Sequence, residues 1–198
     1  GPSRNTESWN GTNWTAVNDL NTKRNNLSGS GVDNTSALAF GTQTPPTVVT
    51  EVWNGTNWTE VNDLNTGRGY TAGFGTATAA ILAGGSPATA ITESWNGTNW
   101  TEVNDLNTAR YGLYAAKQSS TAGLVFGGYV TTDLAVTEEW NGTNWTEVAD
   151  MSIPRFGSAG AGTQAAAVAA AGSRTVPAAL VSEEWTGAGP VTITFTDS

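Results

Sequence analysis

The hexamer Trp9-Asn10-Gly11-Thr12-Asn13-Trp14 recurs unchanged at residues 53–58, 95–100 and 140–145, and a decayed copy begins at Trp185. The copies start 44, 42, 45 and 45 residues apart, and all nine tryptophans of the chain fall in this frame. A period of about 44 residues is typical of a four-stranded propeller blade. A two-helix repeat of that length would need long apolar stretches at helical spacing, whereas the apolar stretches here are short and interrupted by glycine. The sequence therefore predicts an all-β propeller.

Residues 110–150 show how one unit is built around the hexamer. Strand-like segments cover 110–116, 122–128, 136–140 and 145–148, which we number strand one to strand four of a blade. The Asn-Gly pair between strands three and four predicts a tight hairpin, because both residues readily adopt positive φ. First strands are rich in glycine and alanine, so we expect them nearest the propeller axis, where backbones approach closely, with the bulky tryptophans on the outer strands.

Further features repeat with the same period. A Gly-Gly pair closes strand two at Gly84-Gly85 and Gly127-Gly128, and Glu-x-Trp precedes the hexamer turn. An arginine opens strand one in each unit: Arg24, Arg68, Arg110 and Arg155. With these features the chain resembles the Kelch-repeat β-propeller family over residues 4–190. Its near-identical repeat sequences are also similar to those of highly repetitive Kelch-like proteins of bacterial and marine-phage origin. Two units depart from the pattern, because Gly41-Thr42 and Ala171-Gly172 replace the glycine pair.

The resemblance and the unit count together predict a Kelch-like propeller of about four and a half four-stranded blades. Residues 1–3 are typical of the stub left by removal of an affinity tag, and residues 4–198 are expected to form one propeller domain. The expected parts are a half blade at 4–20 and blades at 24–64, 68–106, 110–151 and 155–197. The alternating segment 191–195 is expected to be the closing strand.

Two arrangements satisfy the exposed edge of the half blade. In one, the N-terminal hairpin pairs with strands of residues 155–171 in a four-blade ring, which displaces residues 180–197 to the rim. In the other, residues 155–197 form their own blade and the hairpin occupies a fifth, incomplete radial position. We favour five positions, because every hairpin then buries its aromatic face. Since an incomplete position leaves apolar surface exposed, we also expect a homo-oligomer in which partner chains cover it.

Composition excludes several function classes. The formal net charge is −9, with 8 Lys+Arg against 17 Asp+Glu, so we expect neither nucleic-acid binding nor attachment to an anionic membrane surface. Because the chain holds no Cys and no His, thiolate or histidine metal sites and Ser-His-Asp catalysis are excluded. We therefore expect no enzyme, no cofactor and no metal. Lack of cysteine suits the cytosol or an exposed particle surface, and we favour an extracellular or virion-surface location.

Four residue sets have both a structural and a functional interpretation. Asp19, Asp63, Asp105 and Asp150 fit turn chemistry better than calcium binding, which needs more carboxylates. The overlapping Asn-x-Thr sequences of each hexamer fit hairpin geometry better than glycosylation. The paired tryptophans are expected to form the repeat core rather than sugar platforms: Trp9, Trp14, Trp53, Trp58, Trp95, Trp100, Trp140, Trp145 and Trp185. The four opening arginines either pair with acids inside each blade or form a ring at one channel mouth that binds an anion.

The leading functional expectation is a non-catalytic recognition module that binds a protein or glycan through its propeller loops, an expectation that rests on analogy between folds. The alternative is a structural component of a virion or cell surface in which the repeats serve only as scaffold. Near-identical loops favour the alternative, because a specific asymmetric site needs loops that differ. The ligand-binding candidates are the four arginines.

Overall fold

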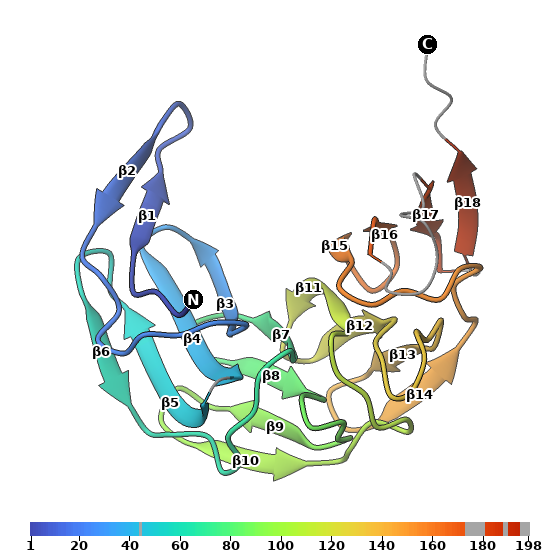
Figure 1. Cartoon of the computed structure of the whole chain (residues 1–198), viewed down its shortest axis with the longest axis horizontal. Helices are drawn as coiled ribbons and strands as arrows, with labels where there is room; N and C mark the ends of the chain where they lie inside the picture. Colours follow the sequence, from blue (N-terminus) through green and yellow to red (C-terminus); the bar gives the residue numbers. More distant parts are fainter. Residues whose placement is uncertain (44, 173–180, 188–189, 195–198) are drawn as a thin grey trace.

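The computed structural model describes residues 1–43, 45–172, 181–187 and 190–194, and none of these residues is helical. Five antiparallel sheets follow one another around an arc (Figure 1). Four sheets have four strands each, and the N-terminal sheet has two. The chain is therefore an all-β propeller of four blades and a partial fifth, as the repeat predicts.

The strands lie in chain order within each sheet. The half blade contains β1 (Thr6–Trp9) and β2 (Trp14–Val17). Blade I contains β3 (Ser28–Asp33), β4 (Ser36–Gln43), β5 (Pro46–Trp53) and β6 (Trp58–Val61), and blade II contains β7 (Ala72–Gly75), β8 (Ala80–Ala83), β9 (Thr92–Trp95) and β10 (Trp100–Val103). Blade III contains β11 (Tyr114–Ser119), β12 (Ala122–Phe126), β13 (Thr137–Trp140) and β14 (Trp145–Val148), and blade IV contains β15 (Ala159–Gly162), β16 (Ala167–Ala170), β17 (Val181–Trp185) and β18 (Pro190–Thr194).

The two ends of the arc do not pair with each other. Strands β15 to β18 form a complete sheet of their own, and β1 pairs with β2 in a separate sheet. Figure 1 shows an open gap between β1–β2 at one end and β17–β18 at the other. The five-position arrangement is therefore the observed one, and the four-blade ring is not formed. The predicted closing strand 191–195 corresponds to β18, although Phe195 lies outside the described residues.

The first strand of each blade starts later than the sequence pattern predicts. In blade III the predicted segment 110–116 is replaced by β11, which begins at Tyr114. Arg110 and Tyr111 form only isolated bridges, and the positive φ of 65° at Gly112 interrupts the extended backbone before β11 begins. Strand two ends at Phe126, since Gly127 and Gly128 both adopt positive φ. At the positions that depart from the glycine pair, Gly41 and Ala171 keep the positive φ of the first glycine, 68° and 55°, although β4 continues past Gly41 to Gln43.

The hairpin prediction is confirmed in all four hexamers. In blade I the Asn54 Oδ1 accepts hydrogen bonds from the backbone N–H of Thr56 at 2.9 Å and of Asn57 at 2.8 Å. Gly55 takes a φ of 90°. Asn10, Asn96 and Asn141 make the same pair of bonds in their own turns. Turn geometry therefore accounts for the first asparagine of each hexamer.

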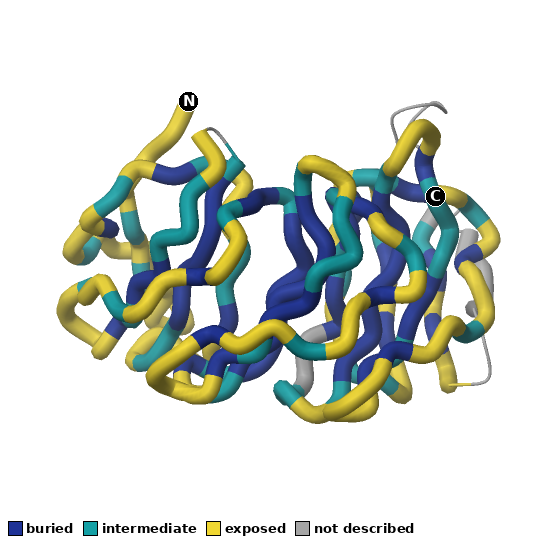
Figure 2. Tube along the Cα trace, turned by 90° about the horizontal axis from the view of Figure 1, so that it is seen from below, coloured by how far each residue is buried: buried dark blue, intermediate teal, exposed yellow. Residues whose placement is uncertain are grey.

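Small residues on the inner strands receive aromatic rings from the neighbouring blade. A Cβ built on Gly73 of blade II would come within 2.8 Å of the Phe40 ring of blade I. Gly160 on β15 meets Phe126 on β12 in the same way, and Gly123 on β12 meets Phe74 on β7 of the preceding blade. Figure 2 shows the result, with buried backbone through the body of the arc and exposed backbone at the loops along both faces.

Candidate functional site

The four opening arginines lie inside the blades and are not displayed at a channel mouth. Each guanidinium forms an ion pair with a glutamate of strand three, and both side chains are at most 2 % exposed. The pairs are Arg24–Glu51, Arg68–Glu93 and Arg110–Glu138 at 2.5 Å, and Arg155–Glu183 at 3.3 Å. An ion pair within each blade is therefore the correct interpretation, and the acid is a glutamate of strand three. The expected anion-binding ring is wrong, because the guanidinium groups are enclosed and already neutralised.

The glutamates are satisfied by further donors from the linker that precedes each arginine. Glu93 Oε2 accepts from the backbone N–H and the side-chain amide of Asn65, both at 2.8 Å. Glu51 accepts the same bonds from Asn21 at 2.7 and 2.8 Å. Burial by itself would raise the pKa of Glu51, but the bonds from Asn21 and Arg24 and the charge of Arg24 outweigh it and hold the pKa below the ordinary value. This network fixes the linker on strand three and so fixes where strand one begins.

The linker aspartates have a structural role within their own blade. Asp105 Oδ1 accepts a hydrogen bond from the Thr92 N–H at 2.9 Å, at the start of strand three. Asp19, Asp63 and Asp150 accept the corresponding bond in the other sheets. A structural role is therefore supported, but the expected local turn is wrong, because each carboxylate bonds a backbone N–H thirteen residues earlier, at the start of strand three. Among the described residues, no group of three or more His, Cys, Asp or Glu side chains is placed to hold a metal ion.

The tryptophans form the core between blades in the complete part of the arc. Trp100 packs edge-on against Phe40 of the preceding blade at 5.1 Å, and its indole N–H donates to Thr50 Oγ1 at 3.0 Å. Trp145 repeats the bond to Thr92 of blade II. The core prediction is wrong for the half blade, where Trp9 is 45 % and Trp14 is 65 % exposed. In the described part of the chain, neither a preceding blade nor inner strands cover these two rings.

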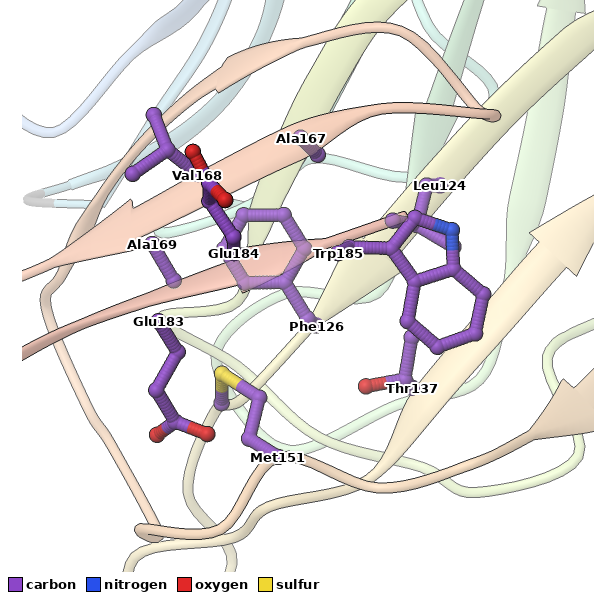
Figure 3. Close-up of a pocket in the computed structure, with 10 residues that line it drawn as sticks. All are labelled: Leu124, Phe126, Thr137, Met151, Ala167, Val168, Ala169, Glu183, Glu184 and Trp185. Atoms are coloured by element: carbon purple, nitrogen blue, oxygen red, sulfur yellow. The ribbon is translucent and has the colours of Figure 1, made fainter. Parts of the chain in front are cut away.

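Register explains a small cavity between blades III and IV. Each first tryptophan lies opposite the second in its hairpin, but in blade IV the residue opposite Trp185 is Pro190. The surface that a second tryptophan would cover includes Phe126 and Thr137, which correspond to Phe40 and Thr50 by strand pairing. Both line the cavity, together with Met151 and Trp185 (Figure 3). Its volume of about 20 Å³ is too small for a ligand, so it is a packing gap.

A cluster of four aromatic side chains, which the repeat pattern did not predict, lies in the loops of blades II to IV. Tyr70, Tyr111, Tyr129 and Phe156, here called the mouth cluster, come together from blades II to IV with ring centroids 5.5 to 6.1 Å apart. All four side chains are half-buried. Three of them lie one or two residues after an opening arginine, which is the signal that could have found them. The arginines hold the linkers, and the residues directly after them carry the rings.

Beneath the mouth cluster, backbone hydrogen bonds connect each blade to the next. Residues two positions after each arginine have positive φ: 49° at Asn26, 56° at Tyr70, 65° at Gly112 and 70° at Gly157. The Tyr70 N–H donates to Asn26 O at 3.0 Å, and the Gly112 N–H donates to Tyr70 O at 2.7 Å. A bulky residue in the left-handed region is costly and concentrates at functional positions. At Tyr70 the chain therefore accepts an unfavourable backbone conformation and places an aromatic ring in the cluster.

The mouth cluster adjoins a cavity on the inner side of the arc. The cavity has a volume of about 440 Å³ and is lined by residues of, or next to, β3, β7, β11 and β15, among them Asn26, Tyr70 and Tyr114. No charged side chain lines it in the described part of the chain. Burial, with a smaller effect of Tyr70, raises the pKa of Tyr114 above the usual value, so its hydroxyl stays protonated and able to donate at neutral pH. The site suits an uncharged ligand with apolar and hydroxyl surface.

The fold and this site define a β-propeller with an uncharged inner cavity and an aromatic rim. The chain matches no model of a known protein family and no curated protein. Within the part of the chain that the structure describes, no helix is long and apolar enough to cross a membrane.

Proposed function

We propose that this chain is a non-catalytic recognition module of the Kelch type, and that the mouth cluster and the adjoining cavity bind its protein or glycan ligand. The observation that carries the proposal is Tyr70, which keeps a strained backbone while its ring contributes to a cluster built from three blades. Aromatic rings beside polar groups in a concave site are typical of ligand-binding surfaces. The uncharged lining favours a neutral glycan over a charged partner.

A glycan array probed with the full chain tests this proposal, followed by titration of any glycan that binds. Tyr111→Ala removes a ring at the centre of the mouth cluster and is expected to weaken binding at least about tenfold, the equivalent of about 1.4 kcal/mol. Trp14→Ala is the matched control, because it removes an exposed aromatic ring far along the chain from the cluster. Equal loss in both variants, or binding that survives Tyr111→Ala, contradicts the proposed site.

The second candidate is a structural component of a virion or cell surface. The supporting observation is that the four hexamer turns are alike in hydrogen bonding and exposed, so they offer repeated rather than specific surface. Absence of any reproducible array signal, together with self-association in solution, would favour this candidate over recognition.

A further inference from the structure

The half blade consists of strands three and four without the strands that accompany them elsewhere. In the described residues β1 pairs only with β2. In the four complete blades, strand three also pairs with strand two on its inner side, as β9 does with β8. The inner edge of β1 therefore has no strand paired to it in the described residues, and its backbone contact is a 3.4 Å bond from the Asn34 side-chain amide to Trp9 O.

Among the described residues, Glu7 in the half blade lacks the arginine that pairs with its equivalents in the complete blades. It occupies the position of Glu51 in strand three, two residues before the first tryptophan. In every complete blade this glutamate is buried against the opening arginine of strand one. Glu7 is exposed, and within the described residues it has no cationic partner. The half blade thus presents a carboxylate whose equivalents in the four other sheets are each paired with a buried arginine.

The surroundings of Trp9 indicate which side chains a strand two paired with β1 would carry. In each complete blade the residue opposite the first tryptophan on strand two is alanine or glycine: Ala37, Ala80, Gly123 and Ala167. The indole N–H of that tryptophan donates to a carbonyl in the turn between strands one and two, such as Asn34 O for Trp53 at 2.9 Å. Trp95, Trp140 and Trp185 make the equivalent bond. Beside Trp9 and Trp14 the half blade instead leaves an open groove of about 360 Å³, which Glu7 also lines.

We propose that the half blade is a docking site for one β-hairpin of the strand-one and strand-two type, supplied by another chain that carries the same repeat. The hairpin opens with an arginine that pairs with Glu7, places alanine or glycine opposite Trp9, and offers a turn carbonyl to the Trp9 indole. Addition of strands to a free edge gives affinity through backbone bonds and specificity through side-chain pockets. Within the described residues, the four hairpins of this type each pair inside their own blade, so none of them is free to occupy this edge.

A peptide of residues 65–85 is a direct probe, because it contains the linker, Arg68 and both strands β7 and β8. Fluorescence anisotropy of the labelled peptide, titrated with the full chain, is expected to show saturable binding. Glu7→Gln in the chain, or Arg68→Ala in the peptide, is expected to weaken binding at least about tenfold, because a charge-assisted bond is lost. Glu102→Gln, an exposed glutamate on β10, is the matched control and is expected to leave binding unchanged.

Hydrogen exchange locates the peptide independently of these variants. Docking is expected to slow exchange in residues 6–9 of β1, while β14, an outer strand with a complete blade inside it, stays unchanged. Tyr111→Ala is expected to leave peptide binding intact, so failure of the mouth site and failure of the docking site are distinguishable. Absence of binding by the monomeric peptide, equal weakening by Glu7→Gln and Glu102→Gln, or protection away from β1 would overturn the proposal.

Discussion

At the Asn-Gly turns, one residue's backbone conformation determines which side chains are accepted. Gly55 has a φ of 90°, yet a Cβ there would meet its nearest neighbour, Thr35 O, at an ordinary 3.4 Å. The cost of substitution therefore comes from the backbone and not from crowding. We expect Gly55→Val to lower the free energy of unfolding by about 1–3 kcal/mol. Thermal melts measure this, with Thr56→Val as the control at an adjacent position of ordinary φ, and equal melting points of the two variants would contradict it.

The ion pairs make stability depend on pH at the level of single residues. The pKa of folded Glu51 lies below its ordinary value, so the unfolded state binds more protons as the pH falls below about 4.3. The stabilisation is complete above that pH and is lost as the pH falls through the folded pKa. Glu51→Gln leaves Arg24 buried without its counter-charge, and we expect it to cost about 3–5 kcal/mol at neutral pH.

Urea unfolding of the wild type and Glu51→Gln between neutral and acid pH checks this expectation. Their difference should shrink as the pH falls, because a protonated glutamic acid and a glutamine both lack the charge. The matched variant Glu102→Gln, on an exposed side chain, should track the wild type throughout. A gap between wild type and Glu51→Gln that is constant with pH would show that the charge of Glu51 does not contribute.

Hairpins of identical sequence contribute different amounts to the free energy of unfolding, depending on their position in the arc. Trp100 is buried against Phe40 and bonds to Thr50, whereas Trp14, its equivalent in the half blade, is 65 % exposed. We expect Trp100→Ala to cost about 3–5 kcal/mol and Trp14→Ala to stay within about 0.5 kcal/mol of the wild type. Chemical denaturation of both variants measures the contrast. Similar losses would mean that the half-blade hairpin is packed in solution.

Hairpins and blade count were predictable because they depend on local turn chemistry and on a period that every blade repeats. For the role of the opening arginines, the sequence left two alternatives, an ion pair within the blade and an anion-binding ring. It could not decide between them because the glutamate that pairs with each arginine lies 25 to 28 residues away along the chain. The late start of β11 was missed because positive φ at Gly112 interrupts an otherwise strand-like pattern. The mouth cluster was missed for a different reason: its rings come from loops of different blades, and only the arc brings them together.

For the whole molecule, the open arc means that each blade is stabilised by its neighbours alone. Inner strands contact those of adjacent blades, as β7 does with β3 and β11, and in the described residues no strand pairing joins the two ends of the arc. A structure built in this way behaves like a linear repeat array, in which stability is a sum of unit and interface contributions. The end units have one interface each, and the half blade also lacks its inner strands. Stability should therefore decrease from the middle of the arc toward both ends.

Native-state hydrogen exchange measures this gradient. Strands β8 and β12 of the middle blades are buried almost throughout, so their amides should exchange slowest, near the limit set by global unfolding. Strand β1 of the half blade and β15 of blade IV are largely exposed and should exchange fastest. Trp100→Ala removes packing between blades I and II, and it should accelerate exchange in the half blade and blade I more than in blade IV. Uniform protection along the chain, changed equally everywhere by Trp100→Ala, would instead require that the two ends are joined in solution and that the propeller unfolds as a closed ring.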